Sequence, residues 1–439
     1  MSEEQSTATA EPSEAASAAG TGGLGAASLF GDMLSRITET GRALIGSETQ
    51  APLIDRAEAL FASDGEVTGT ARARALLDDY AALPEAARHE FLREMAARFA
   101  PDMARVARAV AAYEAAPSPE LARALHIEAE PRSQQLLRLL NRAPQGTLSL
   151  VRMREDLLAV ARGDPALEGL DADFRHLFAS WFNRGFLELR RMDWQTPAAI
   201  LEKIIQYEAV HAIQGWHDLR RRVAAPDRQL YGFFHPALGD EPLIFVEVAL
   251  CREIPGAIGP ILAEEREALD PKRATTAAFY SISNCQNGLR GVSFGSFLIK
   301  QVVEELRRDV PTLSTFVTLS PVPGLTRWLA EDEVRAAAGE EQLAALAAHY
   351  LTLAKRPDGR PLDPVARFHL GNGARLERVN PTADASERGQ RESRGVMVNY
   401  LYDLRDIERN HEAFAAEGEI AQSSAVRRLA RQVPAVLVA

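Results

Sequence analysis

The sequence predicts an α+β protein in which an N-terminal all-helical bundle is followed by an α/β domain with a mixed central sheet. Residues 29–190 form a succession of segments rich in Ala, Leu, Arg and Glu, which favour helices. After residue 222 the pattern changes to short apolar runs with the length of buried strands. Between two of these runs, residues 296–308 have the spacing of an amphipathic helix. At 439 residues the chain is too long for one ordinary core, so we expect one domain over 29–190 and another over 191–439.

The N-terminal region begins with a stretch that is not expected to fold. Residues 1–28 are mainly Ala, Ser, Gly, Glu and Thr, which bury too little apolar surface to offset the entropy of ordering, so we expect a disordered tail. Most of the helical segments that follow are separated by proline or glycine. They are 71–83, 84–99, 102–115, 119–129, 134–140 and 150–163. Asp102 and Ser118 are predicted helix caps.

The second domain is predicted to contain a sheet covered by helices. A connecting segment over 182–194 leads to a helix over 197–216. Strands are predicted at 229–234, 243–250, 278–283, 315–319, 376–379 and 395–402. The first two are joined by a Gly- and Pro-containing segment that suits a hairpin. Helices are predicted at 256–265, 296–308, 331–354 and 365–370. The polar segment 381–394 is expected to be a loop.

Composition limits the partners and the compartment. A net charge of −11 and a pI near 5.5 argue against nucleic acid or an anionic membrane as partner. No apolar run approaches the roughly 20 residues that cross a membrane. Cys251 and Cys285 are too few for a disulfide framework, and the acidic N-terminus lacks the features of a targeting segment. We therefore expect a cytoplasmic protein.

The scattered histidines and cysteines do not form a metal-binding pattern. His211 and His217 are six residues apart, which is not a same-face spacing on a helix, and no cysteine or carboxylate cluster completes a site. No metal is expected. His235 borders a predicted strand and is interpreted as a turn residue. Cys285 lies in a glycine-containing turn and is interpreted as structural.

The loop over 290–296 joins a predicted strand to the amphipathic helix. Its glycines and small hydroxyl residues lie where backbone N–H groups of a helix N-terminus are unpaired, so it could hold an anion such as a pyrophosphate. It lacks the Walker lysine and the full G-x-G-x-x-G spacing. It resembles the R/Q-x-x-G-x-G/A loop of the acyl-CoA N-acyltransferase superfamily, which binds the coenzyme A pyrophosphate. Ser293 departs from that pattern, because the superfamily usually has a glycine there. A tight strand-to-helix connection without a ligand is the alternative.

Several further motifs occur in order along the chain. They are Tyr280-Ser-Ile-Ser283, Gln286-x-Gly-Leu289, Phe297-Leu-Ile-Lys300, Leu319-Ser-Pro-Val-Pro-Gly324 and Phe368-His-Leu-Gly-Asn-Gly-Ala374. With them, the chain from Trp181 to Tyr402 resembles the malonyl-CoA decarboxylase family. The resemblance implies an acyltransferase-like catalytic domain and conversion of malonyl-CoA to acetyl-CoA and CO2. It also implies an N-terminal helical domain through which subunits associate, so we expect a homo-oligomer, either a dimer or a tetramer.

The resemblance also implies roles for individual residues. Loss of CO2 from a malonyl thioester leaves an enolate, so the reaction needs an oxyanion stabiliser and an acid but no cofactor beyond the coenzyme A of the substrate. Ser320 and His369 are implied to act together: the histidine protonates the acetyl carbon, and the serine binds or relays at the malonyl carboxylate. Tyr402 is implied to support the histidine. The implied phosphate cradle consists of Arg290, Gly291, Val292, Ser293, Phe294, Gly295 and Ser296. Some family members have a glutamate at the position of Ser293.

Three other functions are alternatives at this stage. An acyl-CoA-dependent N-acyltransferase would need an amine acceptor cleft and a general base. A non-catalytic acyl-CoA sensor would bind the thioester without turnover. A serine hydrolase is disfavoured because Ser320 lacks the G-x-S-x-G elbow.

Overall fold

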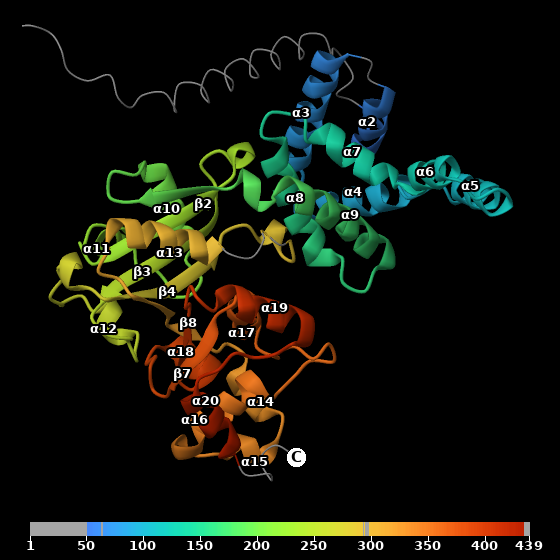
Figure 1. Ribbon diagram of the computed structural model, residues 1–439. Helices are drawn as coiled ribbons and strands as arrows, with labels where there is room; N and C mark the ends of the chain where they lie inside the picture. The colour runs from blue at the N-terminus through green and yellow to red at the C-terminus, as the bar shows by residue number, and fades with distance from the viewer. Residues whose placement is uncertain (1–50, 63–64, 293, 295–297, 434–439) are drawn as a thin grey trace, which may run out of the picture. The chain divides into compact units, whose positions relative to one another are not determined.

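The computed structural model describes residues 51–62, 65–292, 294 and 298–433 (Figure 1). The chain divides into two compact units, residues 1–149 and 150–439. The expected tail over 1–28 lies outside the described residues. The unit division falls before residue 190, where the change in composition places a domain boundary, and that boundary stays a prediction.

The described part of the first unit is helical. Its helices are α2 (Leu53–Ala59), α3 (Glu66–Ala82), α4 (Glu85–Arg98), α5 (Met103–Ala115), α6 (Pro119–Ala129) and α7 (Arg132–Leu140). Large apolar side chains of α3, α4 and α7 form its core, as the buried Leu76, Phe91 and Leu136 illustrate. The rings of Tyr80 and Phe91 join α3 to α4 with centroids 5.4 Å apart. The prediction of helix after helix is therefore confirmed here.

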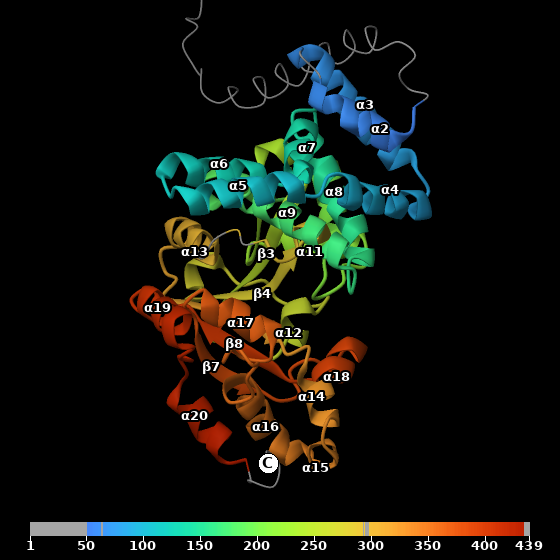
Figure 2. The ribbon, with the colours of Figure 1, turned by 90° about the vertical axis from the view of Figure 1, so that its right-hand side faces the viewer.

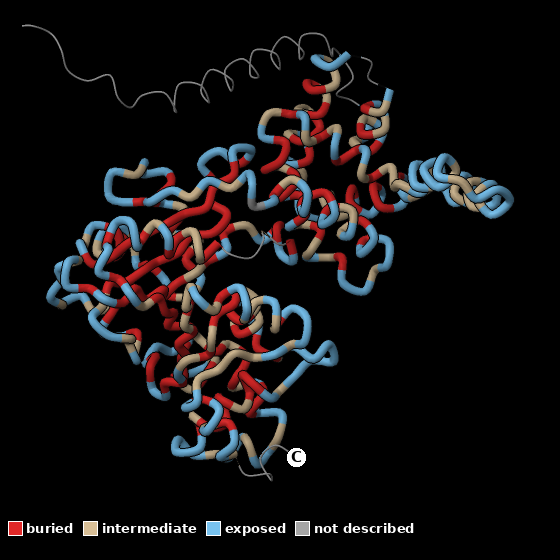
Figure 3. Tube along the Cα trace, in the orientation of Figure 1, coloured by how far each residue is buried: buried red, intermediate tan, exposed pale blue. Residues whose placement is uncertain are grey.

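Helices α5 and α6 pack against each other but contain no buried residue (Figure 3). Both begin at the predicted caps. The Asp102 carboxylate accepts from the N–H groups of Ala104 and Arg105, at 3.0 and 3.1 Å, and the Ser118 hydroxyl accepts from the N–H of Leu121 at 3.2 Å. These side chains satisfy N–H groups that a helix leaves unpaired.

The chain enters the second unit through α8 (Gly146–Val160) and α9 (Pro165–Trp181). The segment expected to be a connection contains the edge strand β1 (Glu188–Met192). The single helix expected over 197–216 is wrong, because the structure has α10 (Ala198–Tyr207) and α11 (Trp216–Val223). Glu208 separates them: its carboxylate accepts from the N–H groups of Val210 and His211, which would otherwise bond within the helix.

The sheet of the second unit has eight strands in the order β1-β2-β3-β4-β5-β8-β6, with β7 paired to β8. The strands after β1 are β2 (Arg228–Phe234), β3 (Pro242–Cys251), β4 (Thr276–Asn284), β5 (Thr315–Thr318), β6 (Ser320–Pro321), β7 (Arg375–Asn380) and β8 (Met397–Leu401). β4 and β5 are parallel, and every other pair is antiparallel. The mixed sheet and the hairpin of β2 and β3 are both confirmed.

The two central strands β4 and β5 separate part of the way along. They pair from Thr276↔Thr315 to Phe279↔Thr318, after which β4 continues beside β3 alone as far as Asn284. A register shift in the β3–β4 pairing leaves Tyr280 without an opposite residue. β5 instead passes into β6, where Ser320 pairs with Val398 of β8. The sheet therefore opens at the point where Ser320 is located.

Helices cover both faces of this sheet. α10 and α11 pack on one face, where Ile204 and Leu219 join Phe245 of β3 in one apolar cluster. On the opposite side of the strands from α11, as Figure 2 shows, α13 (Leu298–Asp309) buries Val302 and Leu306. An ion pair from Arg191 of β1 to Asp309 connects α13 to the sheet edge. The buried segments concentrate in the strands between these helices (Figure 3).

Three further segments differ from the expectation, and two helices were not expected. The helix expected over 256–265 is reduced to α12 (Gly259–Leu262). The expected loop over 381–394 contains the helix α18 (Glu387–Ser393), which the Ser386 hydroxyl caps by accepting from the N–H of Gly389 at 3.0 Å. The segment over 331–354 is divided into α15 (Glu333–Ala336) and α16 (Glu340–Thr352) after α14 (Leu325–Ala330). Two C-terminal helices that the sequence pattern did not predict are α19 (Ile407–Glu417) and α20 (Ser424–Arg431).

Candidate active site

Ser320 and His369, which are distant in the chain, are in contact. The Ser320 Oγ lies 3.1 Å from the His369 Nε2. Ser320 is at the end of the separated central strand, and the prolines that follow it stiffen the turn. The structure brings together the two residues that the resemblance singled out as acting together.

His369 is presented by the helix α17 (Pro364–Gly371). The helix is capped at its start: the Asp363 carboxylate accepts from the N–H of Ala366 at 2.8 Å, and Pro364 occupies the first turn. The chain leaves the helix at Gly373, which has a positive φ of 81°. A Cβ at this position would lie 2.1 Å from the Ile407 carbonyl oxygen, so only glycine fits between α17 and α19. These features fix both ends of the helix.

The His369 ring is held on its second nitrogen and on its face. Its Nδ1 lies 2.8 Å from the Tyr402 hydroxyl, and the ring stacks on Tyr400 with centroids 4.6 Å apart. Burial lowers the pKa of His369 to about 3, so the imidazole is neutral at ordinary pH. Burial also raises the pKa of Tyr402 well above its usual value, so the phenol keeps its proton. The group is therefore a chain of uncharged hydrogen-bonding side chains.

Two residues of this site were missed by reasoning from the sequence. The Thr318 Oγ1 accepts from the Ser320 hydroxyl at 2.8 Å and from the N–H of Tyr400 at 3.1 Å. The Asn399 amide donates to the Thr318 carbonyl at 2.8 Å. A signal for Thr318 was available, because residues two apart on a strand share a face and Thr318 is two residues before Ser320. No comparable signal marks Asn399, whose contact spans 81 residues.

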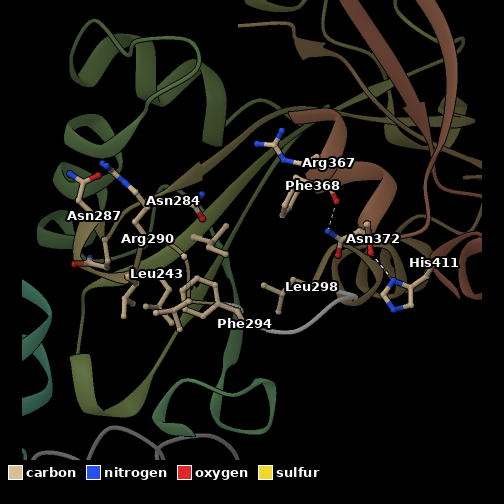
Figure 4. A pocket seen from close by; sticks show the side chains of 16 residues that line it. Leu243, Asn284, Asn287, Arg290, Phe294, Leu298, Arg367, Phe368, Asn372 and His411 are labelled. Carbon is tan, nitrogen blue, oxygen red and sulfur yellow. Dashed lines mark hydrogen bonds between the residues drawn. The ribbon is translucent and has the colours of Figure 1, made fainter. Parts of the chain in front are cut away.

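A cavity of about 550 Å³ lies beside α17 (Figure 4). It is lined by the strand ends, by the loop before α13 and by α17, and Asn287 and Arg290 lie across it from Arg367 and Asn372. Its walls combine apolar side chains, such as Leu243 and Phe294, with these polar groups, which is the composition of a small-molecule site. Arg367 is also held by the carbonyls of Pro361 and Leu362.

The predicted phosphate cradle is partly described. Four of its residues line the cavity, namely Arg290, Gly291, Val292 and Phe294. Ser293, Gly295 and Ser296 lie outside the described residues. Gly291 has a positive φ of 77°, a conformation that glycine adopts without strain. The loop and the cavity are thus in one place, while the binding of a phosphate there stays a prediction.

Ser320, His369 and Tyr402 do not line this cavity themselves. The link is α17, whose Arg367 and Phe368 face the cavity (Figure 4). His369 of the same helix is buried in the protein interior. The ring centroids of Phe368 and His369 are 5.1 Å apart. A molecule in the cavity would therefore contact the residue next to the histidine.

The other residues considered from the sequence have structural surroundings. The His235 ring accepts from the N–H of Ala237 and contacts the Trp181 carbonyl, which confirms the interpretation as a turn residue. Cys285 is buried in the apolar cluster beneath α10, and burial raises the pKa of its thiol well above the usual value, as expected of a structural residue. In the part of the chain that the structure describes, no group of His, Cys, Asp or Glu is arranged to hold a metal ion. Among the same residues, no helix is long and apolar enough to cross a membrane.

Comparison with protein families gives two matches in order along the chain. Residues 99–182 match the family described as "Malonyl-CoA decarboxylase N-terminal domain". Residues 185–339 and 330–436 match the family described as "Malonyl-CoA decarboxylase C-terminal domain".

Curated relatives agree with these matches. The protein named "Malonyl-CoA decarboxylase, mitochondrial" of Anser anser anser is 36% identical over 348 residues, which covers 67% of this chain and 69% of the relative. The protein of the same name in Rattus norvegicus is 33% identical over 414 residues, which covers 80% of this chain and 84% of the relative.

Solved structures agree as well. A crystal structure of malonyl-CoA decarboxylase from Rhodopseudomonas palustris is 52% identical, with a TM-score of 0.82, and the match covers 86% of this chain and 98% of the other. That from Cupriavidus metallidurans is 36% identical, with a TM-score of 0.69, over 90% of this chain and 100% of the other.

Proposed function

This chain belongs to the malonyl-CoA decarboxylase family, and we propose that it converts malonyl-CoA to acetyl-CoA and CO2 through an enolate protonated with the help of Ser320 and His369. The observation that carries the catalytic assignment is the 3.1 Å contact between these two side chains at the opening of the central sheet. A metal-free mechanism of this kind needs only an anion stabiliser and an acid.

The proposed reaction begins with cleavage of the bond between the malonyl methylene carbon and its carboxylate. The electron pair moves into the thioester carbonyl as an enolate, and CO2 leaves. Ser320 binds or relays at the carboxylate before it departs, and for this its hydroxyl proton turns from Thr318, to which it is directed in the free enzyme, toward the carboxylate. A single preorganised hydrogen-bond donor to such a developing oxyanion lowers the barrier by on the order of 3 kcal/mol.

Protonation of the enolate carbon completes the reaction. In the free enzyme His369 is a neutral imidazole, so it can give a proton to carbon only if its other nitrogen gains one. Tyr402, 2.8 Å from the Nδ1, is placed to supply that proton, and water restores it after acetyl-CoA leaves. The net reaction takes up one proton per CO2 released. The enolate carbon is a much stronger base than a phenolate, so the relay runs toward carbon even though burial raises the pKa of Tyr402.

Coenzyme A is proposed to occupy the cavity beside α17, with its phosphates at the loop over 290–296. The cavity of about 550 Å³ is large enough for part of such a ligand, and Arg290 supplies positive charge at its edge. No cofactor beyond this substrate is proposed.

The proposal extends to assembly and compartment. A homo-oligomer built through the N-terminal helical region is supported by α5 and α6, which carry no buried residues in a single chain. A cytoplasmic location is supported by the scarcity of cysteines, whereas the relatives from goose and rat are named mitochondrial. A role in fatty acid metabolism follows only from the proposed substrate.

The test is incubation of the protein with malonyl-CoA in the absence of any amine, with measurement of both CO2 and acetyl-CoA. The proposal requires the two products in equal amounts. Consumption of thioester only after an amine is added would make the protein an N-acyltransferase, and tight binding without turnover would make it a sensor. A parallel assay with methylmalonyl-CoA compares the two acyl groups.

A further inference from the structure

The Thr318 hydroxyl oxygen receives two hydrogen bonds inside the protein. Thr318 is fully buried, and its Oγ1 accepts from the Ser320 hydroxyl at 2.8 Å and from the N–H of Tyr400 at 3.1 Å. A hydroxyl oxygen has two acceptor positions, so these donors fill both. Because Ser320 is the donor in its contact with Thr318, the single proton of its hydroxyl points to Thr318.

The direction of the hydrogen bond from Ser320 to Thr318 determines which atom is the donor in the contact between Ser320 and His369. Because the Ser320 proton is directed to Thr318, its oxygen can only accept across the 3.1 Å contact with the His369 Nε2. The Nε2 must then carry the proton of the neutral imidazole. The Nδ1 is left as an acceptor, which fits the Tyr402 hydroxyl 2.8 Å away. Both contacts of the ring are satisfied by one tautomer.

We infer that Thr318 is a positioning residue that fixes the order of protons in the site, with Tyr402 donating to His369, His369 donating to Ser320, and Ser320 donating to Thr318. The inference deepens the proposed function, on which it rests for the role of His369 as the acid. It places the exchangeable imidazole proton on the nitrogen nearest Ser320. It also means that His369 does not withdraw the Ser320 proton, so the serine is not prepared as a nucleophile.

Hydrogen bonds and apolar packing fix the backbone around Thr318, which keeps the donors and acceptors of the site in this order. Asn399 donates to the Thr318 carbonyl at 2.8 Å and to the Pro255 carbonyl at 3.1 Å, while its own carbonyl accepts from Asn380 at 2.8 Å. Leu319, between Thr318 and Ser320, packs into an apolar cluster with Tyr280. The strand is thus fixed on both faces, and the two hydroxyl groups stay on the same side.

The first experiment reads the tautomer directly in the full-length enzyme. Protein labelled with nitrogen-15 in its histidines is studied by two-bond nitrogen–proton correlation, and the His369 signals are assigned by their loss in His369→Gln. The inference requires a protonated Nε2 and an unprotonated Nδ1 in the free enzyme at neutral pH. A ring protonated on the Nδ1, or on both nitrogens, overturns it. The measurement needs no turnover, so it is independent of whether malonyl-CoA is the substrate.

The second experiment compares two substitutions of nearly equal size. Thr318→Val removes the hydroxyl and frees the Ser320 proton to turn toward the His369 Nε2, so we expect kcat to fall about tenfold or more, an unchanged KM and a shift of the imidazole nitrogen signals toward the other tautomer. Thr318→Ser keeps the hydroxyl and is expected to retain the parental tautomer and most of the turnover.

Each outcome of the comparison between Thr318→Val and Thr318→Ser supports or overturns the inferred order of protons. Thr318→Val with parental turnover and parental nitrogen signals overturns the inference. If Thr318→Val does not fold, the nitrogen spectra of the parent and of Thr318→Ser decide in its place. A parent that releases no CO2 would defeat the proposed function, while its nitrogen signals would still show whether the proton order is right.

Discussion

Two clusters of buried polar side chains in the second unit differ in charge: one is uncharged and the other contains an ion pair. The proposed catalytic chain, which consists of Tyr402, His369, Ser320 and Thr318, contains no charge at neutral pH. The acidic cluster, which we define as Glu208, Asp218, Arg222 and Glu247, contains the Arg222 guanidinium of α11 paired with Asp218 of the same helix and with Glu247 of β3.

The charges of the acidic cluster are matched by many fixed donors. Arg222 pairs with Asp218 and with Glu247, each at 3.1 Å. The Glu208 carboxylate accepts from the hydroxyls of Ser281 and Ser283 on β4. Burial, followed by the nearby Glu208, raises the pKa of Glu247 to about 8, and Arg222 opposes this shift. At a pKa near 8 Glu247 is largely protonated at neutral pH, so loss of Arg222 would chiefly deprive the buried Asp218 carboxylate of one of its two cationic partners.

The comparison teaches which buried polar group can move a proton. Neutral hydroxyl and imidazole groups can exchange protons along hydrogen bonds without creating a permanent buried charge. In a buried ion pair, neutralising one partner leaves the other charge uncompensated, so proton transfer there is costly. We therefore expect substitutions in the catalytic chain to reduce turnover and substitutions in the acidic cluster to reduce stability.

The largest expected effect is on turnover. His369→Ala and Ser320→Ala should each lower the rate of acetyl-CoA formation by two or more powers of ten, because each removes a group that is proposed to act on the reacting atoms. Their folds should persist, which circular dichroism and thermal unfolding would check. Near-normal turnover by either variant would reject its assignment.

Next in size is a loss of stability without loss of chemistry. Arg222→Met removes the cation shared by Asp218 and Glu247, and we expect the free energy of unfolding to fall by about 3 kcal/mol. Urea unfolding measures this change. Turnover per folded molecule should remain close to the parent. Arg221→Met provides the matched control, because Arg221 pairs with Asp218 but not with Glu247 and is more exposed, so its effect should be smaller.

The sequence predicts the strands, the helix caps and the contact of Ser320 with His369 on different grounds. The strands were found because their apolar runs are continuous, and the caps Asp102, Ser118 and Asp363 follow from side-chain chemistry at helix starts. The pairing of Ser320 with His369 was anticipated from the family resemblance alone, because no local pattern connects two side chains that are 49 residues apart in the chain.

What could not be predicted depends on contacts between distant segments. The hydrogen bond from Asn399 to Thr318 exists because β5 and β8 share just one ladder pair, Val317↔Leu401, so a side chain bonds a carbonyl that the ladder leaves open. The exposed helix α18 has few apolar residues, so its composition resembles that of a loop until the cap at Ser386 is recognised. The interruption between α10 and α11 depends on Glu208 meeting β4, which no local pattern shows.

A third prediction concerns the outer end of the catalytic chain. Tyr402→Phe keeps the ring but removes the donor to the His369 Nδ1, and with it the proposed source of the second proton. We expect kcat to fall about 10²-fold, at the lower end of effects on proton transfer. Tyr400→Phe is the control, since the Tyr400 hydroxyl has no partner among the described residues and its ring would still stack on His369. Equal activity of the two variants would contradict a role for the Tyr402 hydroxyl.

The smallest expected effect is on the pH dependence of stability. The folded-state pKa of His369 is lowered to about 3, below the value of about 6.5 in an unfolded chain, so the unfolded state binds the proton more readily. Its contribution is fully present above pH 6.5 and is lost as pH falls toward 3, by about 2 kcal/mol between pH 7 and pH 5. Asp363 acts in the opposite direction, because burial raises its pKa to about 6.

The pH effect is isolated by comparison with His369→Gln. The free energy of unfolding of the parent should fall more steeply between pH 7 and pH 5 than that of the variant, since both retain Asp363 and the other carboxylates. Equal slopes would show that His369 is not held neutral.

The most direct test of the central claim is the analysis of products formed by the parent enzyme from malonyl-CoA in D2O. The account predicts CO2 together with acetyl-CoA that carries one deuterium on its methyl carbon, because the enolate is protonated once by exchangeable groups of the site. Release of free coenzyme A and malonate would show instead that Ser320 or water attacks the thioester, and would contradict the account.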